Sequence, residues 1–462
     1  MAKTSCKIAA LMSGVALLSN PVSAETLTEA FAAAYATNPV LITARANLRA
    51  TDETVPIARA GLRPQVSATV TGSVTDTSGG VSFNGGGTIE SGTASLNATQ
   101  VLYDGGQTYN NIEGAIADVN AARSRLTSTE QSVLLAVVTS FVDVRRDEEF
   151  VVLAKSNIRL IEEQLRAAQD RFDVGEVTRT DVSQAEARLA QALADLAGFE
   201  GALASSIQSY RRVVGQFPGD LKAPPPLPPL PAGLQEAVQL AMDNHPEIRA
   251  ARFDEASARN DIASAQGQLL PTVSLSASAS RTESSSSVNS GQNTASLQAQ
   301  IVVPLYQGGA AYAGVRQSQA LQSAAVSAIH DTTRQIRELV ENAWSDLSVA
   351  RSSIRAGRQQ VRAAQLAFEG VREEAKLGAR TTVDVLDAEQ DLLDARTDLV
   401  ASLRDEYVAG YNLISAIGAL TVADQGIPVE QYSPSVNYNE VNDKYFGFRR
   451  DELTEWKADH RP

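Results

Sequence analysis

Apolar and polar side chains alternate every two residues along four stretches of the chain, which occur as two pairs. The apolar positions of the first pair are Val66, Ala68, Val70, Gly72 and Val74, then Ala94, Leu96 and Ala98. Those of the second pair are Val273, Leu275, Ala277 and Ala279, then Ala295, Leu297, Ala299 and Ile301. This period is typical of β-strands with one apolar and one polar face. Segments rich in Gly, Ser and Asn separate the strands of each pair, so the pattern predicts β-hairpins at about 65–103 and 272–305.

Beyond each β-hairpin the apolar side chains recur every three or four residues, which predicts α-helix. No proline occurs in residues 65–217 or in residues 305–427. A helix of about 60 residues would be roughly 90 Å long, which is typical of antiparallel coiled coils. We therefore expect long helical hairpins at about 107–215 with a tip at 175, and at about 310–418 with a tip at 378. One alanine-rich helix should precede each β-hairpin and end before Pro64 or Pro271.

The chain is an internal two-fold repeat. RFDVGEVTRTDV begins at Arg171, and EAKLGARTTVDV begins at Glu374, 203 positions later. LTEAFAAAYATNP at Leu27 is matched by LQEAVQLAMDNHP at Leu234, 207 positions later. A proline-rich segment, LKAPPPLPPLP, joins the copies as an extended linker. These matches divide the chain into a first repeat at 25–220, a linker at 221–232, a second repeat at 233–420 and a C-terminal segment at 421–462.

The first 24 residues have the composition of a secretory signal peptide. Lys3 and Lys7 precede an apolar run at 8–18 and a small-residue cleavage site that ends at Ala24. The only cysteine, Cys6, would leave with this segment, so no disulfide framework is expected. No other segment approaches the roughly 18 apolar residues of a membrane helix. We therefore expect an exported protein without an inner-membrane helix.

Charge and composition exclude two classes of function. The net charge of −14 becomes −16 without the two signal-peptide lysines, which argues against a nucleic-acid partner. The three histidines, His245, His330 and His460, are isolated from one another, and no nucleophile, nucleotide or metalloprotease motif is present. His245 precedes Pro246 at a helix end and is expected to be a cap or a surface residue rather than a base. We expect neither catalysis nor a cofactor or metal.

Strands of about ten residues are long enough to cross the hydrocarbon of a bilayer when tilted. A soluble β-sandwich is the alternative, because the alternating signal is weak in each segment. Four strands cannot close a barrel, and lipid does not tolerate an open edge. Two chains would give eight strands with a filled interior, whereas three would give twelve strands and a water channel. We expect a mixed α and β membrane protein: a trimeric barrel continued by a coiled-coil tunnel in the periplasm.

This order of parts resembles the TolC family of outer-membrane efflux and secretion ducts. The resemblance is carried by the repeated Leu-x-Pro before each β-hairpin, the Tyr-x-Gly-Gly after it at Tyr103 and Tyr306, and the two glycine turns. It implies a homotrimer in the outer membrane of a Gram-negative bacterium, in contact with outer-membrane lipid. It also implies a passive exit duct of a tripartite efflux or type I secretion system, opened by a periplasmic adaptor and an inner-membrane pump of the RND or ABC type. The segment after Leu420 would join a belt around the tunnel.

The resemblance places adaptor contacts at the two glycine turns. Glycine at a turn is also a means of reaching positive φ, and both roles can hold. The family often has leucine after the glycine, and Glu176 and Ala379 depart from that pattern. The candidate contact residues are Val174, Gly175, Glu176, Leu377, Gly378 and Ala379.

Asp384 and Asp387 lie three residues apart and so share one face of the expected helix. They resemble the paired aspartates that line the tunnel mouth of the family, where three chains would form rings of six carboxylates that attract cations. Asp384 has a competing role, because Thr381-x-x-Asp384 forms a capping-box pattern. Asp387 has no such duty, and the matching residue of the first repeat is Gln184.

The resemblance also implies a latch at the closed mouth. Arg380 is the matching arginine, and Thr180 and Asp181 are its candidate acceptors. The alternative is a solvated charge worth well under about 1 kcal/mol. A tyrosine often found nearby in the family is Ala375 here, which removes one tie of the latch.

A non-conducting trimeric stalk or adhesin is the alternative to a duct. It would explain the helices, but not two membrane-length β-hairpins at the same point in each copy.

Overall fold

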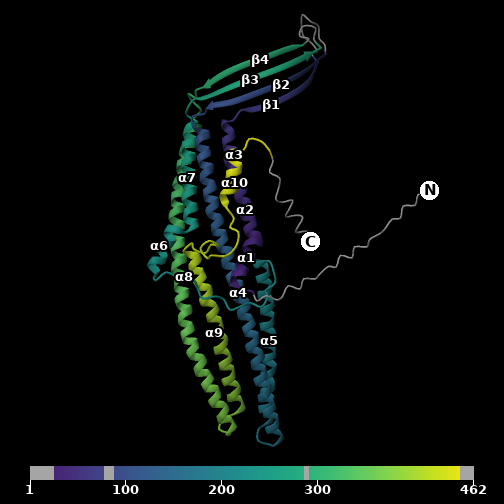
Figure 1. Cartoon of the computed structure of the whole chain (residues 1–462), viewed down its shortest axis with the longest axis vertical. Helices are drawn as coiled ribbons and strands as arrows, with labels where there is room; N and C mark the ends of the chain where they lie inside the picture. The colour runs from purple at the N-terminus through teal and green to yellow at the C-terminus, as the bar shows by residue number, and fades with distance from the viewer. Residues whose placement is uncertain (1–24, 77–87, 286–290, 448–462) are drawn as a thin grey trace, which may run out of the picture.

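The computed structural model describes residues 25–76, 88–285 and 291–447. The expected signal peptide at 1–24, parts of both β-hairpin tips and the end of the C-terminal segment lie outside the described residues. The chain is elongated, with a sheet at one end and the turns of two long helical hairpins at the other (Figure 1). Between these ends the shorter helices and the C-terminal segment lie against the long helices.

The sheet is antiparallel with the strand order β1-β2-β3-β4. Its strands are β1 (Gln65–Asp76), β2 (Thr88–Tyr103), β3 (Thr272–Ser284) and β4 (Gln292–Val302). The central pairing of β2 with β3 joins the two repeats in one sheet. β1 and β4 therefore each have one edge without a partner strand in the described chain.

In the central rows of the sheet, the register separates apolar from polar side chains across all four strands. One row runs Val66, Ala98, Ala277, Leu297, and the next apolar row runs Ala68, Leu96, Ala279, Ala295. The row between them on the opposite face runs Ser67, Asn97, Ser278, Ser296. Val70 and Leu297 are 84% and 73% exposed in the single chain. In its central rows the sheet thus has an apolar face whose side chains lack a covering layer within the described chain, and toward the hairpin tips Arg281 and Asn293 lie on the same face.

Four long helices form the two helical hairpins. The first consists of α4 (Gln107–Asp173) and α5 (Arg179–Val214), and the second of α8 (Ala310–Lys376) and α9 (Thr382–Ala416). α4 and α8 each have 67 residues, which corresponds to about 100 Å. α9 packs against α4 and α5 as well as α8, so the second hairpin lies beside the first. No helix of the described chain is both long and apolar enough to cross a membrane.

The single helix expected before each β-hairpin is broken in both repeats, which corrects that expectation. The first repeat has α1 (Leu27–Thr37), α2 (Pro39–Asp52), α3 (Thr54–Arg59) and a short 3-10 helix (Ala60–Leu62), and the second has α6 (Leu234–Asn244) and α7 (Pro246–Gly267). Pro39 and Pro246 begin new helices because proline lacks the N–H that would continue the preceding one. His245 caps α7, its Nδ1 accepting from the backbone N–H of Glu247 at 3.2 Å, which confirms the expected capping role.

The C-terminal segment lies beside the short helices of the first repeat. Its helix α10 (Pro434–Val441) packs on α2. Asn437 donates to the buried carboxylate of Asp52 at 2.7 Å, and the N–H of Tyr432 donates to Tyr35 Oη at 3.0 Å. These bonds attach the segment to the first repeat, and α10 lies nearer the sheet than the helical tips (Figure 1).

Candidate functional site at the helical tips

Each long helical hairpin turns through the same backbone motif. The N–H of Gly175 donates to the carbonyl of Phe172 at 2.9 Å, and the N–H of Glu176 donates to that of Arg171 at 2.9 Å. In the second hairpin, Gly378 and Ala379 donate to residues 375 and 374 at 3.1 Å and 3.0 Å. This is the Schellman pattern, which needs positive φ at the residue after the cap. Gly175 and Gly378 meet that need with φ values of 81° and 76°.

The residues before the two glycines are apolar and exposed. Val174 is 72% exposed and Leu377 is 86% exposed. A Cβ added at Gly175 or Gly378 would meet no atom within 4 Å in the chain. Both turns therefore present apolar side chains and open backbone to the outside.

The helices that follow the turns begin with matching capping boxes. The N–H and hydroxyl of Thr178 both donate to Asp181 Oδ2 at 2.8 Å. The N–H and hydroxyl of Thr381 both donate to Asp384 Oδ2 at 2.9 Å. Such boxes satisfy backbone donors that have no partner inside the helix. Asp384 therefore does have the capping role that the sequence left open.

Asp384 is held in its charged form. The backbone N–H of Thr381 is the main cause, its hydroxyl and the nearby Arg380 add to it, and together they keep the pKa of Asp384 below its ordinary value. Hydrogen bonds to a carboxylate favour the ionised form. The ionised form of Asp384 is therefore favoured over a wider pH range than that of an ordinary aspartate.

Within the single chain, Arg380 does not bond to Thr180 or Asp181, the acceptors expected for the latch. Its Nε donates to Glu374 Oε2 at 2.9 Å, in the last turn of α8. Asp181 is occupied by its own capping box. Arg380 and Asp181 nevertheless line one cleft of about 460 Å³ between the two turns, together with Glu176 and Ala375.

Asp387 forms an ion pair that the sequence did not reveal. Its carboxylate accepts from Arg188 of α5, so the pair connects the two helical hairpins. The Arg188 and Asp387 side chains are 43% and 56% exposed. The signal in the sequence is that Arg188 is the only basic residue of α5 between Arg179 and Arg211.

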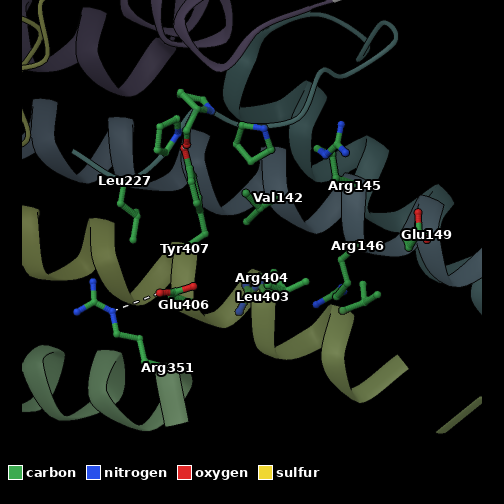
Figure 2. A pocket seen from close by; sticks show the side chains of 14 residues that line it. Val142, Arg145, Arg146, Glu149, Leu227, Arg351, Leu403, Arg404, Glu406 and Tyr407 are labelled. Carbon is green, nitrogen blue, oxygen red and sulfur yellow. Dashed lines mark hydrogen bonds and ion pairs between the residues drawn. The ribbon is translucent and has the colours of Figure 1, made fainter. Parts of the chain in front are cut away.

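A second connection between the hairpins lies at mid-height. There a cavity of about 670 Å³ is bordered by α4, α8, α9 and the proline-rich linker (Figure 2). Tyr407 of α9 reaches the linker and donates to the carbonyl of Pro225 at 3.0 Å. Arg404 Nε donates to Asp143 Oδ1 of α4 at 2.7 Å. The two helical hairpins are therefore connected at mid-height as well as near their tips.

No cluster of His, Asp or Glu side chains in the described residues could hold a metal ion. His245 is buried in its capping position, and this burial lowers its pKa. It is engaged with backbone rather than placed beside a nucleophile.

Comparison with known proteins identifies the family. A model of the family described as outer membrane efflux protein matches residues 31–216 and 237–419, one segment in each repeat. The chain belongs to this family. It is 38% identical over 442 residues to the outer membrane efflux protein BepC of Brucella suis biovar 1 (strain 1330), covering 96% of each chain. It is 27% identical over 441 residues to the outer membrane protein TolC of Escherichia coli (strain K12), covering 89% of this chain and 85% of TolC.

Solved structures of channel proteins have the same fold. The CmeC outer membrane channel of Campylobacter jejuni aligns with a TM-score of 0.76 and 16% identity, over 91% of this chain and 89% of CmeC. CusC aligns with a TM-score of 0.75 and 19% identity, over 85% of this chain and 92% of CusC. The outer membrane efflux family consists of transport proteins, so the alternative of a non-conducting stalk or adhesin is set aside. The chain is an outer-membrane transport protein.

Proposed function

We propose that three copies of this chain close into one twelve-stranded barrel in the outer membrane of a Gram-negative bacterium. The single observation that carries the proposal is the four-stranded sheet with an apolar face, a polar face and two free edges. Its strands have 11 to 16 residues, enough to cross the hydrocarbon layer. An open edge would leave backbone groups unpaired in lipid, so β4 of each copy is expected to pair with β1 of the next.

The number of copies follows from the need for a water-filled lumen inside the barrel. Two copies would give eight strands, whose interior is filled by side chains, whereas three copies leave room for water. The serine- and asparagine-rich rows would then face the lumen, and the apolar rows would face lipid. The long helical hairpins would continue the same channel into the periplasm as a tunnel.

The duct is passive and opens at its helical tips. An adaptor protein in the periplasm would bind the exposed Val174 and Leu377 at the turns, and an inner-membrane pump of the RND or ABC type would supply the energy. The chain serves as the exit of a tripartite efflux or type I secretion system. An adaptor that binds the open tip better than the closed tip shifts the population toward the open form.

The second hairpin is proposed to supply the selectivity of the mouth. Asp384 and Asp387 from three copies would form two rings of carboxylates that attract cations. Asp384 stays charged because of its capping bonds, and the charge of Asp387 is partly balanced by Arg188. Arg380 is proposed to act as the latch toward a neighbouring copy, because within the chain it reaches only its own hairpin.

Planar-bilayer recording and native mass spectrometry of the purified protein test this function together. The expected result is a trimer that gives discrete ion currents with a preference for cations. A matched pair of variants tests the orientation of the mouth, because Asp387→Asn should weaken cation preference while Asp195→Asn, whose half-buried carboxylate accepts from Gln191 within α5, should not. A trimer without current would refute the duct, and a stable detergent-free monomer would refute the barrel.

A further inference from the structure

One buried acidic side chain lies where the two helical hairpins meet. Glu389 of α9 is 3% exposed, and neither of its carboxylate oxygens has a hydrogen-bond partner in the described chain. One turn before it, Leu386 packs into an apolar cluster with side chains of the first hairpin. We call this cluster the hairpin interface, formed by Ile158, Ile161, Ala185, Ala192 and Leu386. Charged groups in such a setting are costly unless they are paired.

The space beside Glu389 is too small to hydrate a carboxylate. A cavity of about 10 Å³ lies between α4, α5 and α9 and is bordered by Glu389, Asn157, Arg188 and Gln191. A volume of this size holds at most about one water molecule. The amide groups of Asn157 and Gln191 border the cavity without bonding to Glu389. The neutral acid therefore fits this position better than the anion does.

The charged groups around Glu389 do not offset its own charge. α4 contributes Glu163, whose negative charge repels it. α5 contributes Arg188, whose guanidinium is engaged with Asp387. On α8, which packs against α9, Arg372 lies over the ring of Phe368 and 3.9 Å from Glu373. Burial first, and the repulsion by Glu163 second, raise the pKa of Glu389 to about 7.

We propose that Glu389 is a proton-binding site that keeps α9 against α4 and α5 when it is protonated and loosens the hairpin interface when it is ionised. Ionisation leaves a carboxylate in the interface and gives the proton to solvent. Separation of the interface then lowers the free energy of the protein, because water can reach the anion. The proposal rests on the duct function, in which movement of the second hairpin away from the first opens the tip.

The direction of the pH effect follows from the raised pKa. The closed form binds the proton more tightly than the open form, so the closed form is favoured at low pH. The stabilisation of the closed form by the proton on Glu389 is complete below 4.5, the ordinary pKa of a glutamate, and is lost as the pH rises to about 7. A difference of this size corresponds to a shift in the closed-to-open ratio of at most about 300-fold in each copy. Asp384, whose pKa is lowered, titrates below this range.

The first test is the open fraction of the full-length protein in planar bilayers between about pH 4.5 and 8. The open fraction of the unaltered protein should rise with pH. Glu389→Gln, which imitates the neutral acid, should stay closed and lose the pH response. Glu163→Gln should keep the response but move its midpoint to lower pH, whereas Glu162→Gln, an exposed neighbour on α4, should behave as the unaltered protein. A Glu389→Gln profile that matches the unaltered protein would overturn the proposal.

A second test separates this inference from the duct function. Without the signal segment the chain has no cysteine, so spin labels can be placed at two chosen positions. Labels at Glu176 and Ala379 report the distance between the two turns in detergent-solubilised trimer, without any need for current. If this distance increases with pH only when Glu389 is present, the proton site stands even if no current is found. If current is found but neither distance nor open fraction depends on Glu389, the proton site is refuted and the duct remains.

Discussion

The ion pair between Arg188 and Asp387 gives a quantitative prediction about the closed tip. Breaking it removes a charge interaction between the first and second hairpins, so the open fraction should increase. Both side chains are about half exposed, so water screens the pair, and each copy should contribute about 0.2–1 kcal/mol. If three copies open together, the total of about 0.6–3 kcal/mol corresponds to a rise of about 3- to 150-fold in the open-to-closed ratio.

A double-mutant cycle measures the interaction energy between Arg188 and Asp387 separately from the effect of removing either charge alone. Arg188→Gln, Asp387→Asn and the double variant are compared by their open-to-closed ratio in planar bilayers, and not by the size of the current. The matched control is Lys155→Gln, because Lys155 and Glu200 form an ion pair of 3.2 Å and similar exposure inside the first hairpin. That change should leave the ratio unaltered. Additive effects of the two changes, or an equal effect of Lys155→Gln, would refute the reasoning.

Three further predictions concern the caps, the sheet and the mouth. Thr381→Ala should cost about 1 kcal/mol of local stability and speed hydrogen exchange at the start of α9, whereas Thr180→Ala, which removes no capping bond, should not. Leu297→Arg should oppose membrane assembly by about 2–4 kcal/mol per copy if its row lies near the bilayer centre, whereas Ser296→Arg on the opposite face should leave assembled trimer in folding yields. Cation preference should persist as the pH falls to about 4, because the pKa of Asp384 is lowered. The negative charge of Asp384 is present above the ordinary aspartate pKa and is lost only below the lowered pKa. A loss of cation preference at about pH 5 would contradict this.

The strands and the tips could be inferred because their signals are local. Alternation at Val273 and its neighbours requires only the two-residue period of a strand, and the β3–β4 register pairs Val273 with Ile301 as the two alternating series suggest. Gly175 and Thr178 mark the end of one helix and the start of the next by requirements that each residue meets alone. The breaks at Pro39 and Pro246 were also encoded locally, but the continuous alanine-rich pattern concealed them.

The contacts between the hairpins could not be inferred in the same way. Glu389 reads as an exposed acid in a charged helix, and its burial depends on which face of α9 meets the first hairpin. Arg188 finds Asp387 only because two helices that are distant in the sequence lie side by side. The pairing of β2 with β3 also joins segments from different repeats. Such contacts depend on packing between elements, which local periodicity does not specify.

The two turns of the chain share a backbone but differ in chemistry. Gly175 is followed by Glu176, whereas Gly378 is followed by Ala379, and Gln184 stands where the second copy has Asp387. A ring of three chains would therefore place six nearly equal backbones in a circle while keeping only three-fold chemical symmetry. Any partner that surrounds such a mouth must therefore meet two kinds of docking position in alternation, alike in backbone and different in side chains.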